Sequence, residues 1–381
     1  MKSLFWISFF VIVYVYILYP VLIYFLSLFY KKPVKIKYLY PRVSVILPVY
    51  NEDEHIEEKL NSLLRINYPE ARYEILVGSD GSTDRTKEIV ETALGRQAKL
   101  VLQRIRFFEF KERKGKCAMV NFLVSLATGE ILVFTRCRQE WDVNALEEIV
   151  RNFSDKRVGA VSGALCFKKP ENNKARGGLQ VYWKYEKFIR KSESRMGSML
   201  GASGALYAIR KELYPGLPNN LILDDVYIPL KIVEKGYRAL FDKKSKVYDM
   251  GQDNPGEEYW RKTRTLAGNF QLLIYLRELF NPLRGKISWQ FFSHKFLRLI
   301  APYLLIAMLV SNYFLINSFT YRVFFALQVV FYALALMGAV WRHKNFLLDV
   351  PHMFVVMNTA AVVGLVRFLA RKQGVRWEKV G

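Results

Sequence analysis

The stretch Tyr73-Glu-Ile-Leu-Val-Gly-Ser-Asp-Gly-Ser-Thr-Asp84 decides how this chain folds. Its first residues are apolar or favour β-structure, and they lead directly into a turn that carries Asp80 and Asp84. A helical pattern begins at about Thr83, so the stretch predicts a strand that ends in a polar turn at a helix N-terminus. Open α/β sheets bind ligands at such places.

The two carboxylates narrow the type of ligand that suits this turn. A bare phosphate at a helix N-terminus needs backbone N–H groups or cations, whereas two acids suit the hydroxyl and N–H groups of a nucleoside. A structural alternative is that Asp84 caps the following helix while Asp80 shapes the turn. From this stretch alone both interpretations stay open.

The neighbouring segments alternate between strand and helix patterns. Buried-strand runs are followed by runs with helical spacing, and the first helix has acids in its first turn. The expected elements are strands at Val43–Val49, Tyr73–Val77, Lys99–Gln103 and Ile131–Thr135, and helices at Asn51–Leu64, Thr83–Leu94 and Lys116–Ala127. This succession predicts an α/β fold with a doubly wound, mostly parallel sheet. No G-x-G-x-x-G follows the first strand, so an ordinary dinucleotide fold is not supported.

The composition combines 52% hydrophobic residues with a net charge of +23, which indicates that apolar and basic segments are segregated. Leu4–Phe29 contains no charged residue and is long enough to span a membrane. It is too long for a cleaved signal peptide. Four lysines follow it directly, which favours a cytoplasmic location for this end: Lys31, Lys32, Lys35 and Lys37.

The C-terminal part is apolar again, and its candidate spans are Leu299–Ser318, Val323–Trp341 and Phe346–Val366. Basic clusters flank the last of them on both sides. Either that segment does not cross the membrane, or the positive-inside rule fails here. We expect a multi-pass protein of the cell inner membrane whose large polar domain is cytoplasmic.

These patterns give five expected regions. Residues 1–30 form a transmembrane helix, 31–41 a basic linker and 42–280 the α/β domain. Residues 281–298 mix aromatic and basic side chains, which suits an amphipathic helix in the headgroup layer, although an ordinary surface helix is the alternative. Residues 299–381 form the C-terminal membrane region with a basic tail.

The cysteines and the basic residues limit the partners that we expect. The three cysteines have neither metal-site spacing nor an even disulfide set, so we expect a reducing compartment. Much of the basic charge flanks membrane segments, where anionic lipid explains it. No nucleic-acid recognition module is visible, and no nucleic-acid partner is expected.

Five motifs in order give a more specific interpretation. They are Val43-Ser-Val-Ile-Leu-Pro-Val-Tyr-Asn-Glu52, Ser79-Asp-Gly-Ser-Thr-Asp84, Arg113-Lys-Gly-Lys116 with Asn121, Gly201-Ala-Ser-Gly204, and Leu223-Asp-Asp225 with Lys235-Gly-Tyr237. In this order they resemble the membrane-anchored, inverting family 2 glycosyltransferases of the GT-A fold, similar to bacterial polysaccharide and glycolipid synthases. The resemblance implies a Rossmann-like GT-A sheet with N-terminal and C-terminal transmembrane helices.

The resemblance also implies roles for individual residues. On the donor side, Tyr50 and Glu52 lie beside the base, Asp80 accepts hydrogen bonds from base or ribose, and Lys114 and Lys116 neutralise diphosphate, unless they belong to a solvated basic loop. Asp225 is the expected general base, because an inverting transfer needs one carboxylate to take the acceptor hydroxyl's proton. Asp224 caps the following helix or lies with Ser203 and Gly204 on the acceptor and sugar side.

Two segments depart from the family pattern. Arg261, Arg264 and Thr265 stand where polysaccharide synthases have Gln, Arg and Trp, so only Arg264 is retained to bind diphosphate. The missing Trp puts chain elongation in doubt.

At the end of the fourth strand, Arg136 and Arg138 occupy both acid positions of the metal-binding DxD-like motif. An arginine cannot ligate Mg²⁺ or Mn²⁺. Three readings are open: the arginines replace the metal, the protein is a catalytically silent scaffold, or Glu140 and Asp142 supply ligands in a shifted register. No metal ligand is assigned from the sequence.

We therefore expect a transferase that moves a sugar, with inversion, from a nucleotide-diphosphate donor at the cytoplasmic membrane face. UDP is the expected nucleotide, and the expected acceptor is a lipid-linked glycan or a polysaccharide. The expected partners are the nucleotide sugar, the acceptor and membrane lipid.

Overall fold

The computed structural model describes the chain except for residues 96–103, 168–176, 250–254, 341–344 and 371–381. It divides into two compact units, which we describe separately. The helical unit contains Met1–Tyr30, Pro170–Glu193 and Gln252–Gln373. The sheet unit contains Lys31–Lys169 and Ser194–Gly251.

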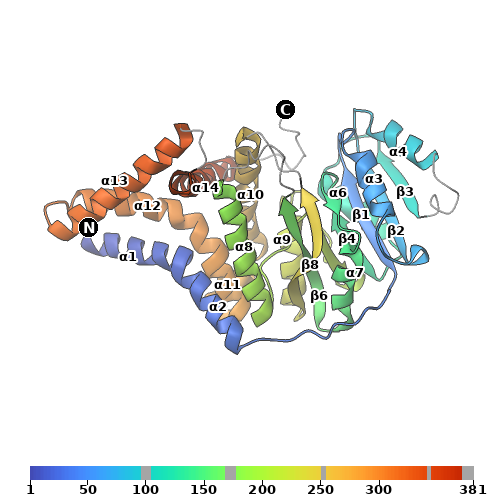
Figure 1. Cartoon of the computed structure of the whole chain (residues 1–381), viewed down its shortest axis with the longest axis horizontal. Coiled ribbons are helices and arrows are strands. Elements are labelled where there is room, and N and C mark those ends of the chain that lie inside the picture. Colours follow the sequence, from blue (N-terminus) through green and yellow to red (C-terminus); the bar gives the residue numbers. More distant parts are fainter. Residues whose placement is uncertain (96–103, 168–176, 250–254, 341–344, 371–381) are drawn as a thin grey trace. The chain divides into compact units, whose positions relative to one another are not determined.

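The sheet unit is built on an eight-stranded sheet in the order β3-β2-β1-β4-β7-β6-β8-β5 (Figure 1). The strands are β1 (Val43–Val49), β2 (Tyr73–Asp80), β3 (Ile105–Phe110), β4 (Ile131–Thr135), β5 (Glu140–Trp141), β6 (Val158–Phe167), β7 (Leu206–Arg210) and β8 (Arg238–Asp249). The predicted strand at Lys99–Gln103 lies outside the described residues.

The predicted parallel arrangement holds for the half of the sheet that carries the first three sequence motifs. Strands β3, β2, β1 and β4 are parallel, so their carboxyl ends meet at one edge. Strand β7 is antiparallel to both β4 and β6, while β6 and β8 are parallel and β5 is antiparallel to β8. Asp80 and Thr135 end their strands at the edge where the parallel strands finish.

Helices cover both faces of this sheet, as the doubly wound prediction requires. The described helices of the sheet unit include α3 (Ile56–Leu64), α4 (Thr86–Gly95), α6 (Lys116–Leu126), α7 (Ala145–Val150) and α9 (Asp224–Glu234). Helices α3 and α7 pack on the face of Val45 and Leu47. Helix α6 packs on the opposite face, where a Cβ added at Gly78 would lie 2.3 Å from the Met119 sulfur.

Two predicted helices begin later than their sequence patterns suggested. Helix α3 begins at Ile56 because Asn51 has φ +51°, a left-handed conformation that a right-handed helix does not contain. Helix α4 begins at Thr86, since Asp84 accepts a hydrogen bond from the Thr86 N–H. This contact confirms the capping interpretation of Asp84.

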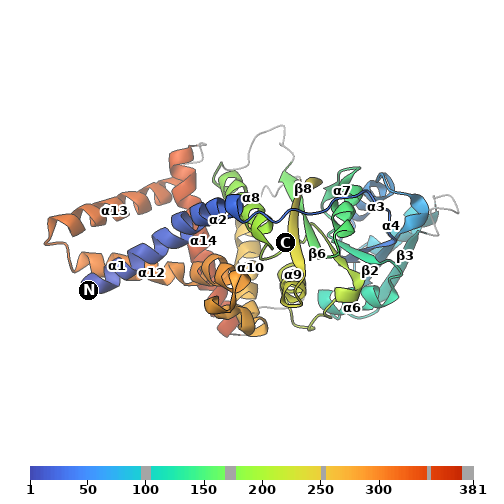
Figure 2. The same ribbon diagram turned by 90° about the horizontal axis from the view of Figure 1, so that it is seen from below.

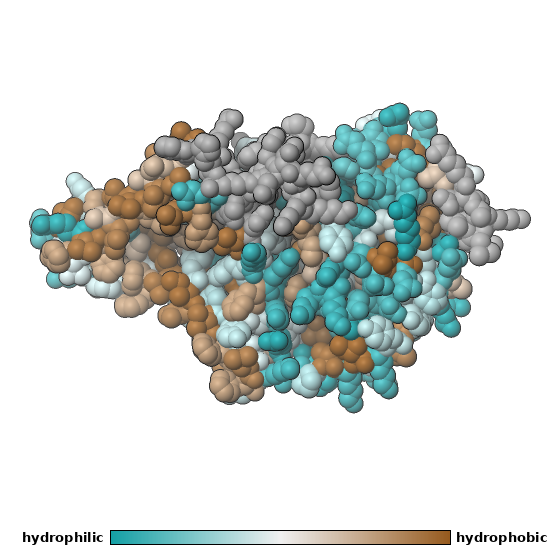
Figure 3. Space-filling view, in the orientation of Figure 1, coloured by the Kyte–Doolittle hydropathy of each residue, from teal (hydrophilic) through white to brown (hydrophobic). Residues whose placement is uncertain are grey.

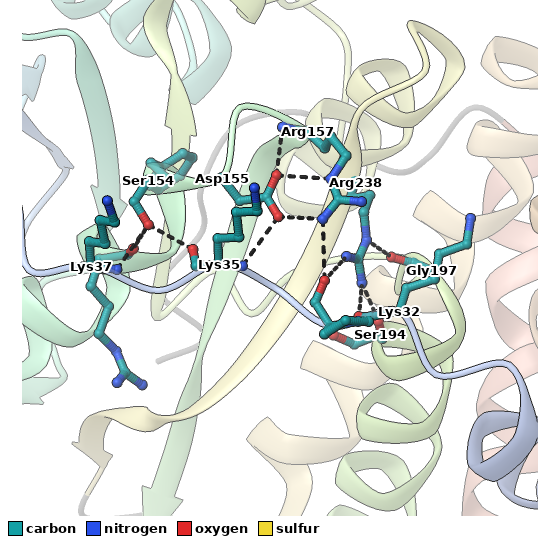
Figure 4. A network of polar contacts seen from close by, with 12 residues as sticks. Lys32, Lys35, Lys37, Ser154, Asp155, Arg157, Ser194, Gly197 and Arg238 are labelled. Carbon is teal, nitrogen blue, oxygen red and sulfur yellow. Dashed lines mark hydrogen bonds and ion pairs between the residues drawn. The ribbon is translucent and has the colours of Figure 1, made fainter.

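The predicted basic linker runs as an extended strap along the sheet unit (Figure 4). The N–H of Lys35 donates to Asp155 Oδ2 at 3.3 Å, and the N–H of Lys37 donates to Ser154 Oγ at 3.0 Å. The guanidinium of Arg238 donates to the Lys32 carbonyl. Since its backbone is held in this way, the strap leaves its lysine side chains exposed.

The helical unit contains the apolar segments. Its described elements are α1 (Lys2–Val13), η1 (Tyr14–Leu18), α2 (Tyr19–Phe29), most of α8 (Gly177–Met196), α10 (Pro255–Tyr275), α11 (Lys286–Gln290), η7 (Phe291–Phe296), α12 (Leu297–Tyr313), α13 (Phe319–Val340) and α14 (Phe346–Leu369). Helix α1 lies along α12, and α14 packs against α13 and α10 (Figures 1 and 2).

Four stretches of the described residues are long and apolar enough to cross a membrane: Lys2–Phe29, Lys286–Tyr313, Phe319–Val340 and Phe346–Leu369. Hydrophobic side chains cover much of the visible surface of these helices (Figure 3). The expected interfacial segment at 281–298 is helical from Lys286 and continues into α12 without a break. Together these features describe a membrane protein.

Candidate functional site

The site lies where the carboxyl ends of the parallel strands meet the first turns of α4, α6 and α9. The loop after β1 and the loop after β2 are held together by reciprocal hydrogen bonds. The Thr83 N–H donates to Asn51 Oδ1 at 2.8 Å, and the Asp53 N–H donates to Asp84 Oδ2 at 3.1 Å. Burial raises the pKa of the Asp84 carboxyl, but hydrogen bonds from Thr86 and Asp53 outweigh it and lower the pKa.

Asp80 fixes the basic loop that follows β3. Its buried carboxylate accepts hydrogen bonds from the Lys114 N–H at 2.8 Å and the Gly115 N–H at 2.9 Å. Asp80 therefore fixes the loop after β3, a role that the sequence did not predict, and its recognition of a nucleoside stays a prediction. Because each carboxylate oxygen has two lone pairs, the same group retains acceptor capacity for a ligand.

Tyr50 carries a partner that the sequence did not single out. The Arg113 guanidinium lies over the Tyr50 ring, with its carbon 3.7 Å from the ring centroid. This contact places a flat cation between the end of β1 and the basic loop. Arg113 belongs to the same basic run, 111–116, as Lys114 and Lys116, but the sequence predicted no role for it.

The first turn of α9 carries Asp224 and Asp225, both mostly buried. Lys116 Nζ lies 2.6 Å from Asp224 Oδ1, and the Tyr207 hydroxyl donates to Asp224 Oδ2 at 3.3 Å. Burial raises the pKa of Asp224, but the Lys116 ammonium more than offsets this and lowers it. Asp224 is thus ionised in its pair with Lys116, and Leu223 rather than Asp224 is the N-cap residue of α9.

Asp225 lies against the loop of the fourth motif. Its backbone carbonyl accepts a hydrogen bond from the Ala202 N–H at 2.8 Å, and Arg136 Nη2 lies 3.3 Å from Asp225 Oδ2. A Cβ added at Gly204 would lie 2.7 Å from Asp225 Oδ2 and still closer to Arg136. Ser203 is held beside this group, because its N–H donates to Ser162 Oγ.

The Arg136–Cys137–Arg138 turn joins the two halves of the site. Arg136 pairs with Asp225, and Arg138 Nε lies 3.9 Å from Glu52 Oε2. The expected residues of the sheet unit are therefore brought together along one edge. Arg264 lies on α10 in the helical unit, and we describe its position only within that unit.

The side chains at the DxD-like position do not fit a divalent metal ion. Mg²⁺ and Mn²⁺ need oxygen ligands, and Arg136 and Arg138 are cations. The nearby Asp142 carboxylate accepts hydrogen bonds from the Asn144 N–H and the Tyr248 hydroxyl. Within the described part of the chain, no group of three His, Cys, Asp or Glu side chains is placed to hold a metal. A shifted register that uses Glu140 and Asp142 gains no support from these contacts.

Lys59 is a second residue that the sequence analysis missed. It lies on the buried face of α3 and is 2% exposed. Its Nζ donates to Thr135 Oγ1 at 2.9 Å and to the Gln139 carbonyl at 2.8 Å. The spacing Ile56, Lys59, Leu60, Leu63 carried the signal, because it places a lysine on the apolar side of an amphipathic helix.

The buried lysine predicts a pH dependence of stability. Burial lowers the pKa of Lys59 from 10.5 to about 7, so between these values the unfolded chain binds a proton that the folded chain lacks. Stability should therefore rise with pH across this window, by up to about 1.4 kcal/mol per unit. Denaturation of the detergent-solubilised protein from pH 7.5 to 9.5 measures this slope. Lys59→Met should reduce the slope and the surface variant Lys87→Met should not, and equal slopes in all three proteins would contradict the assignment.

Gly204 predicts a local effect on activity. In Gly204→Ala the new methyl group displaces Arg136 and the Asp225 carboxylate. We therefore expect the steady-state rate of the reaction catalysed at this site to fall by up to about 100-fold. Gly197→Ala is the matched control, because a Cβ there meets no atom within 4 Å. Steady-state rates and melting temperatures of the two variants test this. Equal rates in both would show that the close approach at Gly204 is unimportant.

Comparison with known proteins agrees with this geometry. Residues 44–216 match the family model described as glycosyl transferase family 2. The chain is 31% identical over 211 residues to glycosyltransferase AglE of Haloferax volcanii, covering 53% of this chain and 64% of that protein. It is 22% identical over 248 residues to poly-beta-1,6-N-acetyl-D-glucosamine synthase of Staphylococcus aureus, covering 64% and 58%. The chain thus spans about six-tenths of the length of each of these relatives.

A solved structure resembles nearly the whole chain. The mannosyltransferase PcManGT from Pyrobaculum calidifontis, solved in complex with GDP-Man and Mn²⁺, superposes with a TM-score of 0.76 at 25% identity. The match covers 97% of this chain and 99% of that one. The expected GT-A fold is thereby confirmed. Residues 44–216 of this chain therefore form a glycosyl transferase family 2 domain.

Proposed function

We propose that this protein transfers a sugar, with inversion, from a nucleotide-diphosphate sugar to a lipid-linked or polysaccharide acceptor at the cytoplasmic face of the inner membrane. The observation that carries the proposal is the position of Asp225. It is a mostly buried carboxylate beside Gly204, and the cations Lys116 and Arg136 pair with the two acids of its helix turn. The proposed base and the cations proposed to bind diphosphate therefore come from neighbouring loops.

The reaction follows from this arrangement. The acceptor oxygen forms a bond to the anomeric carbon from the side opposite the diphosphate, while Asp225 takes the hydroxyl proton. The bond between the anomeric carbon and the phosphate oxygen breaks, and the nucleoside diphosphate leaves with the electron pair. Cations near the diphosphate stabilise the charge that develops on it. Attack from the opposite side inverts the configuration.

A donor screen tests the proposal. The full chain, reconstituted in lipid nanodiscs, is supplied with UDP-sugars and GDP-sugars, including GDP-mannose because PcManGT was solved with it. Membrane lipid extracts and oligosaccharides serve as acceptors. Release of nucleoside diphosphate and the anomeric configuration of the product are measured. A product with retained anomeric configuration would contradict the inverting mechanism. If no donor releases nucleoside diphosphate, the proposal that the protein is an enzyme is wrong.

A catalytically silent scaffold is the second candidate, and one observation favours it. The position that carries acids in the family carries arginines, and one of them is paired with the expected base. A scaffold predicts that the protein binds nucleotide diphosphate without turnover. The same screen separates the two candidates, because only an enzyme releases the nucleotide from its sugar.

A further inference from the structure

The Arg136–Cys137–Arg138 turn lies between the nucleoside half and the catalytic half of the site. Cys137 is buried in the hydrophobic core, while the side chains of Arg136 and Arg138 are 47% and 39% exposed. Arg136 reaches toward Asp225 and Arg138 toward Glu52. A nucleotide-diphosphate sugar has its diphosphate between its nucleoside and its sugar, so this is where that group would lie.

The present partners of the two arginines hold them only weakly. The two ion pairs measure 3.3 and 3.9 Å, and their arginine side chains are well exposed. Exposed ion pairs of this kind are worth at most about 1 kcal/mol. A diphosphate offers several anionic oxygens to guanidinium groups that bind such oxygens in pairs. The arginines can therefore exchange these carboxylates for the ligand at little cost.

The turn is also braced from beneath by a buried lysine. Lys59 donates to Thr135 Oγ1 and to the Gln139 carbonyl, which are the residues on either side of the turn. The Thr135 hydroxyl also accepts a hydrogen bond from Trp141 Nε1 and donates to the Ala205 carbonyl. Both ends of the turn are thereby fixed, and one of them is tied to the loop of Gly204.

A buried ammonium is costly unless something compensates for it, and burial lowers the pKa of this one to about 7. A methionine would fill the same space without that cost. A lysine at this position therefore fits a requirement for hydrogen bonds at the base of the turn. Lys59 acts through the turn and does not reach the ligand, so it is a positioning residue.

We infer that Arg136 and Arg138, braced by Lys59, bind the donor's diphosphate directly and take the place of a divalent metal ion. The inference rests on the proposed function, because it assumes a nucleotide-diphosphate donor. It differs from that proposal in what it requires: the enzyme should bind and use its donor in the presence of a chelator.

Equilibrium binding of UDP, GDP, UMP and GMP to the detergent-solubilised full chain tests the inference. The nucleoside diphosphate that binds should do so equally well in EDTA and in Mn²⁺. In Arg136→Gln/Arg138→Gln its affinity should fall by about 100-fold, while that of the monophosphate changes little, because charge-assisted hydrogen bonds contribute about tenfold or more each. Arg65→Gln/Arg72→Gln is the matched control, since it removes the same charge from exposed positions that do not lie at the carboxyl ends of the parallel strands.

Two further variants sharpen the test. Lys59→Met should weaken diphosphate binding by about tenfold and leave monophosphate binding unchanged, which a general loss of stability would not do. Arg136→Asp/Arg138→Asp should bind diphosphate only when Mn²⁺ is added, because it restores carboxylates at both positions. Melting temperatures confirm that each variant is folded.

The possible failures are distinguishable. Loss of wild-type diphosphate binding in EDTA, or unchanged binding in the double glutamine variant, would overturn the inference and leave the proposed transfer standing. No binding of UDP or GDP with or without Mn²⁺ would overturn both. Asp225→Asn should keep diphosphate binding and lose sugar transfer. An incorrect assignment of the general base would therefore be detected in the transfer assay, independently of diphosphate binding.

Discussion

Asp225→Asn is expected to reduce the rate of sugar transfer by about 10²- to 10⁴-fold, the range that a positioned general base contributes. The substitution keeps the size and the hydrogen-bonding shape of the side chain and removes its ability to take a proton. The measurement is kcat for nucleotide release at saturating donor and acceptor. Because Asp225 pairs with Arg136 only at 3.3 Å, we expect little change in stability.

Asp224→Asn is the matched control for this experiment. Asp224 lies one residue away, but its carboxylate is held in the buried pair with Lys116. We expect Asp224→Asn to lower the melting temperature more and kcat less than Asp225→Asn does, because a buried pair that loses one charge leaves the other uncompensated. The reverse pattern, with transfer surviving in Asp225→Asn, would move the base to Asp224.

The second large effect is expected in the helical unit, where a buried ion cluster joins three segments of the chain. Glu186 on α8 bonds to Arg298 on α12 and lies 3.4 Å from His294 Nε2. Glu193 accepts a hydrogen bond from the Tyr19 hydroxyl at 2.7 Å and lies 2.8 Å from His294 Nδ1. The cluster therefore connects the N-terminal helix with α8 and η7.

Glu186→Leu should destabilise the folded protein by about 3–5 kcal/mol, because it leaves the Arg298 guanidinium buried without its carboxylate. Glu186→Leu/Arg298→Met removes both charges and should recover most of that loss. Unfolding of the detergent-solubilised protein, analysed as a double-mutant cycle with Arg298→Met, gives the coupling energy. If the free energy of unfolding lost in the double variant equals the sum of the losses in the two single variants, the interaction between Glu186 and Arg298 does not stabilise the unit.

Much of the sheet unit was predictable from local patterns. The runs Val43–Val49 and Ile131–Thr135 became strands with the predicted bounds, because short apolar runs rich in β-branched residues favour buried strands over helices. The helix starts at Asn51 and Thr83 were wrong by a few residues. There the left-handed Asn51 and the capping Asp84 decided the boundary, and both depend on the contact between two loops.

The candidate site was only partly predictable. Asp80, Lys116 and Asp225 belong to motifs that can be recognised from the sequence alone. Arg113 stands in the third of these motifs but received no role from it, and Lys59 stands in no motif. Lys59 contacts residues 76 and 80 positions further along the chain, and only the parallel pairing of β1 with β4 brings them together.

The sequence by itself determined the alternation of strands and helices, the apolar spans and the reversed charge at the DxD-like position, because these depend on residue type and spacing. The tertiary structure alone decided that Asp80 holds the basic loop, that Arg136 reaches Asp225 and that Lys59 lies beneath the arginine turn. These contacts join residues on different strands and helices, and their partners are set by sheet order and packing rather than by local pattern. The acidic turn at the end of β2 therefore supports the basic loop after β3.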